Sequence, residues 1–295
     1  MKVGFASLIG RPNAGKSTLL NHILGRKVAI VSDKPQTTRN RIIGVKNYTE
    51  GQSVFLDTPG IHRPLHRMNV RMVDVALESI REVDVLALVV DATERTGRGD
   101  RFVIDLFKEV SSPIVVVLNK LDLIAKQRLL PLMDWYRQQR EFHAIIPISA
   151  RVGDGVSQFE KIVIEAMPKG QALYPKEFVT DQQESVLAAE IVREQLLRFT
   201  RMEIPFSSTV VVDQFEERKT DGLLRIYCSV FVEQKSQKRI VVGRAGDMLK
   251  RIGTAARLEL EGVFATKVFL DLHVKVKPKW RENDRLLDTL GLPRS

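Results

Sequence analysis

The stretch GRPNAGKST at residues 10–18 constrains the fold of this chain more than any other. It matches the pattern G-x-x-x-x-G-K-[ST] and follows the apolar run VGFASLIG, which we interpret as a first strand. The two glycines let the N–H groups of a loop turn inward around phosphate oxygens, and the positive end of the following helix points at the same place. Lys16 can neutralise charge on the outer phosphates, and the Ser17 hydroxyl can ligate Mg²⁺. By itself the stretch is also compatible with an ordinary glycine-rich turn before a helix.

Two further segments favour a nucleotide site over such a turn. SVFLDTPG places Asp57 at the end of a strand, where its carboxylate can hold Mg²⁺ through a water, and the Gly60 N–H can sense a terminal phosphate. PIVVVLNKLD is a fully apolar strand, which is typical of a parallel sheet. The sequence therefore predicts a doubly wound α/β sheet with a nucleotide at the carboxyl edge of its strands.

Asp122 indicates which base this nucleotide carries. Guanine presents two donors side by side, N1–H and the 2-amino group, which one carboxylate can accept together. Adenine has an acceptor at N1 and no 2-amino group, so a site built this way can reject it by about 10⁴ or more. Asn119 would brace the loop, and the aliphatic stem of Lys120 would cover the base. A third apolar strand, AIIPISA, ends at residues 149–151, whose backbone could meet the guanine O6.

The composition favours an intracellular protein with an anionic partner. A length of 295 residues with 44% apolar content suggests about two domains. The single cysteine, Cys228, excludes a disulfide framework, and no apolar run approaches the roughly 18 residues that span a bilayer. We therefore expect a soluble protein of a reducing compartment. A net charge of +10 favours nucleic acid or an acidic membrane surface as partner.

The second half of the chain predicts a smaller α+β domain. Residues 169–181 contain a proline and little periodicity, so we interpret them as a linker. A helical pattern follows over residues 186–199, and two-fold alternation over residues 224–232 and 268–276 predicts strands of a sheet that is covered on one side. Between these strands, GRAG at residues 243–246 forms a G-x-x-G turn between two short helices. Such a turn can bring N–H groups up to a nucleic-acid backbone, although a lone G-x-x-G is more often part of a simple helix–turn–helix.

The order of these motifs resembles the P-loop GTPases of the translation-factor class, and PQTTRNRI at residues 35–42 resembles the first switch of the Era family. The resemblance of this stretch implies that Thr38 ligates Mg²⁺ in the GTP state and that residues 32–41 form a switch loop. Asn13 matches GTPases in which an asparagine helps to hold K⁺, which could neutralise transition-state charge. The alternative for Asn13 is a loop residue that bonds its own backbone.

The second half resembles a type II KH domain, and the pairing of the two domains resembles the Era family over essentially the whole chain. The resemblance implies binding of the single-stranded 3′ end of 16S-type ribosomal RNA and a role in maturation of the small ribosomal subunit. It also implies a cytoplasmic protein that can associate peripherally with the inner face of the membrane. No DNA partner is expected.

The chain departs from related patterns at three positions. Signalling GTPases place a glutamine after D-x-x-G to orient the attacking water, whereas this chain has Ile61, so we predict slow hydrolysis. The Era family usually carries a lysine where this chain has Ala245, and Asp247 adds a negative charge beside a predicted phosphate site. We therefore predict usable but not exceptional RNA affinity.

The motifs predict four segments and four sets of functional residues. The segments are a GTPase domain at residues 1–168, a linker at 169–181, a KH domain at 182–280 and a tail at 281–295. The predicted nucleotide-binding residues are Gly10, Arg11, Pro12, Asn13, Ala14, Gly15, Lys16, Ser17, Thr18, Asp57, Thr58, Pro59, Gly60, Ile61, Asn119, Lys120, Asp122, Ser149, Ala150 and Arg151. The predicted catalytic residues are Lys16, Thr38 and Gly60, and the predicted Mg²⁺ ligands are Ser17, Thr38 and Asp57. The predicted RNA-binding residues are Gly243, Arg244, Ala245, Gly246, Lys250 and Arg251.

Three other classes of protein fit these motifs less well. A membrane-recruited signalling GTPase would need a lipid anchor or a long basic amphipathic helix. A metabolic P-loop kinase would have no use for the NKxD motif, and a structural RNA-binding protein would not need a complete Mg²⁺ and guanine set. Outside these motifs, we interpret the charged stretch ERTGRGDR at residues 94–101 as a solvated loop.

Overall fold

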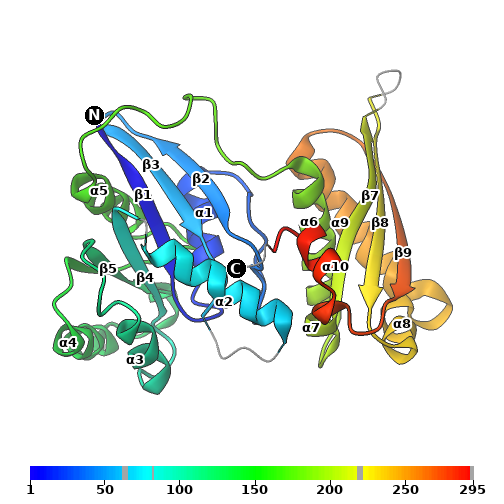
Figure 1. Cartoon of the computed structure of the whole chain (residues 1–295), viewed down its shortest axis with the longest axis horizontal. Coiled ribbons are helices and arrows are strands. Elements are labelled where there is room, and N and C mark those ends of the chain that lie inside the picture. The colour runs from blue at the N-terminus through cyan, green and yellow to red at the C-terminus, as the bar shows by residue number, and fades with distance from the viewer. Residues whose placement is uncertain (62–65, 82, 218–221, 293–295) are drawn as a thin grey trace. The chain divides into compact units, whose positions relative to one another are not determined.

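The structure is a computed structural model that describes residues 1–61, 66–81, 83–217 and 222–292. The chain divides into two compact units, and the division along the sequence falls between Asp181 and Gln182. Each unit has its own sheet, as Figure 1 shows. The predicted fold class, a doubly wound α/β domain followed by a smaller α+β domain, is confirmed.

The first unit is built on a six-stranded sheet in the order β2-β3-β1-β4-β5-β6. Every neighbouring pair is parallel except β2 and β3, which are antiparallel. The strands are β1 (Lys2–Ile9), β2 (Ile42–Asn47), β3 (Gly51–Asp57), β4 (Val85–Asp91), β5 (Ile114–Asn119) and β6 (Ala144–Pro147). The central strands are buried on both faces, which explains why their sequences are continuous apolar runs rather than alternating ones.

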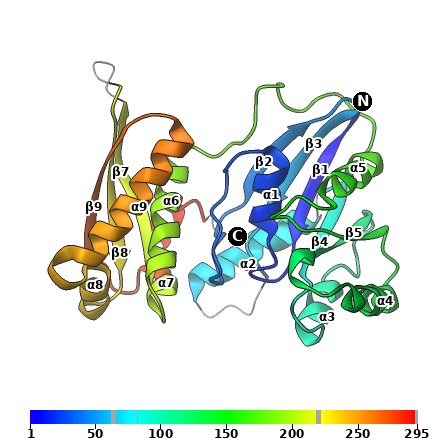
Figure 2. The same ribbon diagram turned by 180° about the vertical axis from the view of Figure 1, so that it is seen from behind.

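Helices cover both faces of this sheet. They are α1 (Lys16–Leu24), α2 (Arg67–Arg81), α3 (Arg98–Asp105), α4 (Leu129–Gln139) and α5 (Val156–Ala166). Helices α1 and α5 pack into the core on one face, and α2, α3 and α4 pack into the core on the other, as the two opposite views show (Figures 1 and 2). The parallel strands β1, β3, β4, β5 and β6 end at one edge of the sheet, where the loops of the predicted nucleotide site gather.

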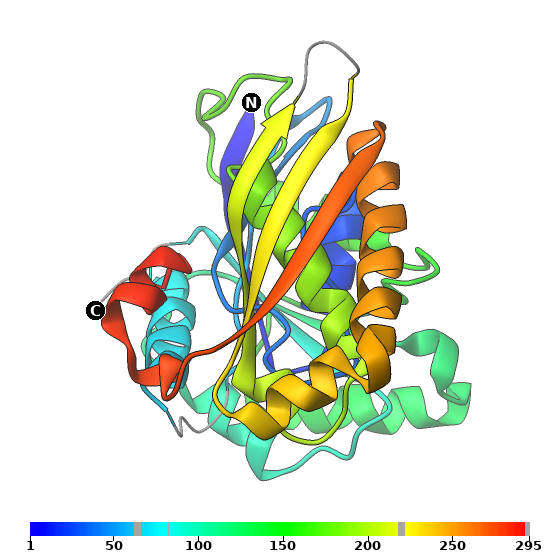
Figure 3. The same ribbon diagram turned by 90° about the vertical axis from the view of Figure 1, so that its right-hand side faces the viewer.

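The second unit is a mixed three-stranded sheet with helices on one face. Strand β8 (Leu224–Val232) lies between β7 (Ser208–Glu217), which is antiparallel to it, and β9 (Val268–Val276), which is parallel. Helices α6 (Glu184–Phe199) and α9 (Asp247–Phe264) lie behind this sheet in Figure 3. The short helices α7 (Ile204–Ser207) and α8 (Lys235–Val242) complete the unit. Cys228 is buried on the helix-facing side of β8, and burial raises the pKa of its thiol to about 12.

The segment at residues 169–181, predicted as a linker, is hydrogen-bonded along the first unit. The side chain of Gln52 is fully buried in β3; its Oε1 accepts from the Tyr174 N–H at 3.0 Å and its Nε2 donates to the Tyr174 carbonyl at 2.8 Å. The Val45 N–H of β2 donates to the carbonyl of Val179 at 2.8 Å. The segment therefore lies against β2, an outer strand of the sheet, instead of forming a free tether.

The C-terminal segment is ordered as far as the description extends. Trp280 is buried and donates its indole N–H to the carbonyl of Ser207 at 2.8 Å. Helix α10 (Asp284–Thr289) follows, and residues 293–295 of the predicted tail lie outside the described residues. Within the described part of the chain, no helix combines the length and apolarity needed to cross a membrane.

Candidate functional site

The loop at residues 10–15 connects β1 to α1 and requires glycine at both ends. Gly15 has a left-handed φ of +94°, and a Cβ built there would lie 2.2 Å from Nδ2 of Asn119. A Cβ on Gly10 would lie 2.2 Å from the carbonyl oxygen of Val89. The loop is therefore seated against the ends of β4 and β5, and its backbone is held at the N-terminus of α1, where N–H groups can receive phosphate.

Lys16 is buried at the centre of this loop. Its ammonium donates to the carbonyl oxygens of Gly10 at 3.2 Å and Arg11 at 3.1 Å, so the loop closes around the charge. Burial lowers the pKa of Lys16 to about 8, and the nearby carboxylate of Asp57 opposes that shift. A buried cation with two carbonyl partners is suited to receiving additional negative charge.

The three predicted Mg²⁺ ligands lie together beside Lys16. The Ser17 hydroxyl donates to Oδ2 of Asp57 at 2.6 Å and lies 2.8 Å from the Thr38 hydroxyl, which itself lies 3.4 Å from Oδ2. Burial raises the pKa of Asp57 to about 6, against the charge of Lys16 and the hydrogen bonds that it accepts. Its Oδ1 is also buried and makes no well-formed hydrogen bond with any residue that the structure describes. Such a set of hard oxygen donors fits Mg²⁺.

The loop after β3 packs directly on the phosphate loop. The Thr58 hydroxyl donates to the Leu8 carbonyl at 2.9 Å, which fixes this loop to β1. A Cβ on Gly60 would lie 2.7 Å from Cα of Pro12, so the two loops approach to backbone contact. The side chain of Ile61 is buried in the apolar core cluster on the face of the sheet that α2, α3 and α4 cover.

The residues predicted to recognise the base form a second hydrogen-bonded group. Asn119 donates to the Ala14 carbonyl at 2.8 Å and accepts from the Ala150 N–H at 2.9 Å, so it ties the phosphate loop to the loop after β6. The Ser149 hydroxyl donates to Oδ1 of Asp122 at 2.6 Å and orients that carboxylate.

The remaining predicted nucleotide residues lie around these two groups. Thr18 lies in the first turn of α1, and Asn13 adopts a left-handed φ of 63° in the phosphate loop. Lys120 follows β5 with a left-handed φ of 68° and begins the short helix at Leu121–Leu123. Arg151 is exposed immediately beyond the loop that Asn119 holds.

The G-x-x-G turn at residues 243–246 joins α8 to α9 through three left-handed residues. These are Gly243 at φ 75°, Ala245 at φ 50° and Gly246 at φ 84°. A Cβ on Gly243 would lie 2.6 Å from Cβ of Met248, so glycine is required there. The turn presents backbone at the N-terminus of α9, the position that the predicted phosphate contact needs.

A groove of about 390 Å³ runs from this turn between α9 and β9. It is lined by Gly246, Leu249, Lys250, Gly253, Thr254, Arg257, Leu270 and Leu272. Lys250 lies in the groove as predicted for an RNA contact, whereas the guanidinium of Arg251 lies 5.1 Å from the ring centre of Phe199 on α6. The helical spacing from Lys250 could have indicated Arg257, which the sequence prediction missed.

Family models match both units. A model described as a 50S ribosome-binding GTPase matches residues 5–120, and a KH-domain model matches residues 203–281. GTPase Era of Geobacter metallireducens is 48% identical over 288 residues, which cover 98% of this chain and 97% of the relative. GTPase Era of Ruminiclostridium cellulolyticum is 47% identical over 290 residues, with 98% and 97% covered. The chain belongs to the Era family of GTPases.

Solved structures of the Era family agree over the whole chain. An Aquifex aeolicus Era variant bound to GDP·AlF4⁻ has a TM-score of 0.95 and 39% identity, with 100% of both chains covered. Era in complex with MgGDPNP and nucleotides 1506–1542 of 16S ribosomal RNA has a TM-score of 0.95 and 38% identity, again with 100% of both chains covered. The family resemblance read from the motifs is therefore confirmed.

The prediction of a solvated loop at residues 94–101 is wrong for part of that stretch. Helix α3 begins at Arg98, and Asp100 is only 7% exposed. Its carboxylate pairs with Arg11 of the phosphate loop at 3.5 Å and accepts from the hydroxyl of Tyr136 at 3.3 Å. Asp100 is buried because it faces inward with Val103 and Ile104, and its distance of three and four residues from them was the available signal.

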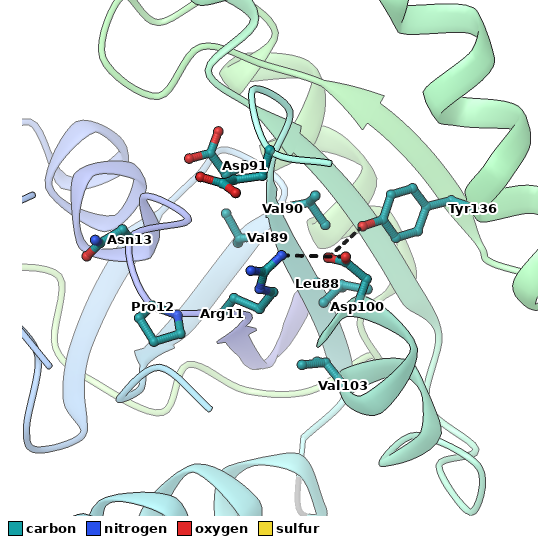
Figure 4. A pocket seen from close by; sticks show the side chains of 11 residues that line it. Arg11, Pro12, Asn13, Leu88, Val89, Val90, Asp91, Asp100, Val103 and Tyr136 are labelled. Carbon is teal, nitrogen blue, oxygen red and sulfur yellow. Dashed lines mark hydrogen bonds and ion pairs between the residues drawn. The ribbon is translucent and has the colours of Figure 1, made fainter. Parts of the chain in front are cut away.

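This network lines a cavity of about 130 Å³ next to the phosphate loop of the Era-family site. Figure 4 shows Arg11 pointing to Asp100 within it and the Tyr136 hydroxyl approaching from α4. Asp91, at the end of β4, lies on the same cavity and was also missed by the sequence prediction. Both aspartates contact side chains of other elements, namely Lys120 after β5 for Asp91 and Arg11 and Tyr136 for Asp100, which motif spacing does not reveal.

Proposed function

We propose that this chain is a slow GTP-hydrolysing switch that binds the single-stranded 3′ end of 16S-type ribosomal RNA and acts in maturation of the small ribosomal subunit. Membership of the Era family supports the GTPase activity. The complete match to an Era structure that contains MgGDPNP and 16S ribosomal RNA supports the nucleotide, the metal and the RNA. The proposed location is the cytoplasm, with peripheral association at the inner face of the membrane.

The observation that carries the proposal is the orientation of Asp122. Ser149 holds one of its carboxylate oxygens at 2.6 Å, and Asn119 holds the loops on either side of it. A carboxylate fixed in this way can accept the two adjacent donors of guanine and would face a lone pair on adenine. Asp122 is exposed in this structure, and a bound base would cover it. Because a covered carboxylate that faces no donor is costly, the site should discriminate strongly between the two bases.

The phosphate end of the site assigns roles to three residues. Lys16 would stabilise negative charge that develops on the outer phosphates, and the Gly60 N–H would contact the terminal phosphate. Thr38 would join Ser17 and Asp57 in holding Mg²⁺. When bound there, Mg²⁺ would neutralise negative charge on the phosphates.

Slow hydrolysis follows from the position of Ile61. Its side chain is buried in the core, so the position after D-x-x-G supplies no polar group to orient water. The attacking water must then be held by backbone or by a partner. Asn13 is proposed to help hold K⁺ beside the phosphates, where a cation would lower the barrier.

The KH unit supplies the proposed RNA grip. The groove between α9 and β9 combines the apolar side chains of Leu249, Leu270 and Leu272 with the cations Lys250 and Arg257. Such a groove suits unstacked bases, while the backbone of the G-x-x-G turn suits a phosphate. Arg244, Ala245 and Arg251 complete the proposed RNA-binding set with the glycines of the turn.

Binding measurements on the full chain test this proposal. Calorimetry should give tight Mg²⁺-dependent binding of GTP and GDP and at least 10³-fold weaker binding of ATP, on the order set by hydrogen-bond discrimination. A single-stranded RNA copying the 3′ end of 16S ribosomal RNA should bind, and Gly246→Asp should abolish that binding while leaving GDP binding unchanged. Equal affinity for ATP, or indifference to unpaired RNA, would overturn the proposal.

The proposed K⁺ site has a separate test. Turnover of GTP should fall when K⁺ is replaced by Li⁺ at the same ionic strength, and Asn13→Ala should lose that dependence. Identical rates in the two salts would leave Asn13 as a loop residue that bonds its own backbone.

A further inference from the structure

The ammonium of Lys120 is held by a carboxylate that no motif includes. Lys120 directly follows β5, and its Nζ donates to Oδ2 of Asp91, the last residue of the neighbouring strand β4. Asp91 lies opposite Asn119 in the parallel register of the two strands. The pair therefore forms where two adjacent strands deliver their ends to the nucleotide edge of the sheet.

Asp91 is itself fixed on its other side. Its Oδ1 accepts from the N–H of Thr93 at 2.9 Å and from the Thr93 hydroxyl at 2.6 Å. Burial raises the pKa of the Asp91 carboxyl, but the hydrogen bonds from Lys120 and Thr93 outweigh burial and leave the pKa below its ordinary value. Asp91 is therefore an ionised, oriented partner, with a side chain that is 14% exposed against 29% for Lys120.

The backbone of Lys120 is also held. It adopts a left-handed conformation, its carbonyl accepts from the Leu123 N–H at 2.9 Å, and the Leu121 N–H donates to the Ile148 carbonyl at 3.0 Å. Both ends of the lysine side chain are thus anchored, and its methylene stem is drawn out between β5 and β4. A free lysine would lose side-chain entropy when it covers a base, whereas an anchored one has lost it before the ligand arrives.

We infer that Asp91 is a positioning residue for the nucleotide, which pre-organises the stem of Lys120 as the surface against which the purine ring packs. The inference rests on the guanine site of the proposed function. The two aspartates then have different roles. Asp122 hydrogen-bonds the edge of the base, and Asp91, through Lys120, positions the surface that packs against the face of the base. Loss of Asp91 should lower the affinity for every purine nucleotide that Asp122 accepts, and by the same factor for each.

A double-mutant cycle on the full chain tests this assignment. Dissociation constants for Mg–GDP and Mg–IDP would be measured for the natural chain, Asp91→Asn, Lys120→Met and the double variant. Loss of one charge-assisted hydrogen bond should weaken both nucleotides about tenfold in Asp91→Asn and leave the GDP to IDP ratio unchanged. The double variant should bind no more weakly than Lys120→Met, because Asp91 acts only through that lysine.

The matched control is Asp105→Asn, which breaks an exposed ion pair between the last residue of α3 and Lys108 in the turn that follows, and should leave nucleotide affinity unchanged. Thr93→Val is the second variant, for the case in which Asp91→Asn does not fold. It removes one hydrogen bond to the Asp91 carboxylate and keeps the carboxylate itself. GDP affinity should fall two- to threefold, about the effect of one neutral hydrogen bond. Three outcomes would overturn the inference. Asp91→Asn could lower nucleotide affinity as much in the Lys120→Met background as in the natural chain. The ratio of GDP affinity to IDP affinity could change, or both single variants could bind with unchanged affinity. If the natural chain binds no guanine nucleotide, the proposed function itself fails.

Discussion

The nucleotide site and the RNA turn differ in how much of their geometry is fixed by side chains. At the nucleotide site, Lys16, Asp57 and Asn119 are buried and hydrogen-bonded, Lys16 within the phosphate loop and the other two to elements far apart in the sequence. At the G-x-x-G turn, the ligand-facing groups are backbone, and the shape comes from left-handed residues. The first arrangement can reject a ligand over a single atom, and the second can accept any phosphate of the right spacing.

The largest expected effect comes from Asp122→Asn, which tests whether side-chain atoms decide the base. The amide would place a donor against the donors of guanine, so GTP affinity should fall by about 10³-fold. Xanthosine triphosphate, which carries a carbonyl in place of the 2-amino group, should gain affinity. Calorimetry with both nucleotides measures the exchange, and unchanged RNA binding serves as the control. Retained GTP affinity would mean that the loop backbone selects the base.

A pH titration probes the buried charge. Because the pKa of Lys16 is about 8 without nucleotide, its ammonium is mostly charged at pH 7 and half charged at pH 8, so Mg–GDP affinity should fall by no more than about twofold between these two values. Above pH 8, binding must take up a proton, so affinity should fall by up to about tenfold per pH unit. Calorimetry up to pH 9 measures this slope. Lys16→Arg should abolish it, and a natural chain with a flat profile to pH 9 would contradict the prediction.

At the RNA turn a charge change should have a smaller, graded effect. Asp247→Lys removes a negative charge beside the proposed phosphate path and adds a positive one, so affinity for single-stranded RNA should rise severalfold. The plot of log affinity against log salt should steepen by roughly one unit. Asp247→Asn removes the negative charge without adding a positive one, so it separates the loss of repulsion toward phosphate from the gain of a new phosphate contact. It should leave the slope of log affinity against log salt unchanged. Weaker binding by Asp247→Lys would exclude a phosphate path at this loop.

The smallest expected effect on chemistry comes from Ile61→Gln. A glutamine at this position would have to leave the core to reach the nucleotide, so the turnover of GTP without a partner should not rise. Burying its amide should instead lower the free energy of unfolding by about 1–3 kcal/mol. Ile61→Leu is the conservative control. A large increase in single-turnover rate would show that the side chain can reach the attacking water.

The sequence predicted those parts of the molecule that depend on local pattern. The apolar strand at residues 114–118 and the spacing of GxxxxGKS specify a parallel sheet and the phosphate loop that it must carry. The alternation over residues 224–232 likewise specifies the covered sheet of the KH unit. These features follow from periodicity and from the conformational needs of glycine, which any reader of the sequence can apply.

The missed residues depend on tertiary packing. Asp91 is important because Lys120 comes from the adjacent strand, and Asp100 because Arg11 and Tyr136 converge on it from other elements. A proline-containing stretch such as residues 169–181 has the composition of a linker whether or not a buried glutamine holds it. Composition describes what a segment can do alone, and these contacts decide what it does in the fold.

The attachment of residues 169–181 to β2 has a consequence for solubility. A strand at the rim of a sheet offers unpaired backbone groups that can template addition of a foreign strand. Here the N–H of Val45 is already taken by Val179, so the rim is sealed by the chain's own polypeptide. Inserting glycine and serine into this segment would therefore not only lengthen it. It would also expose unpaired backbone groups of β2 and promote self-association.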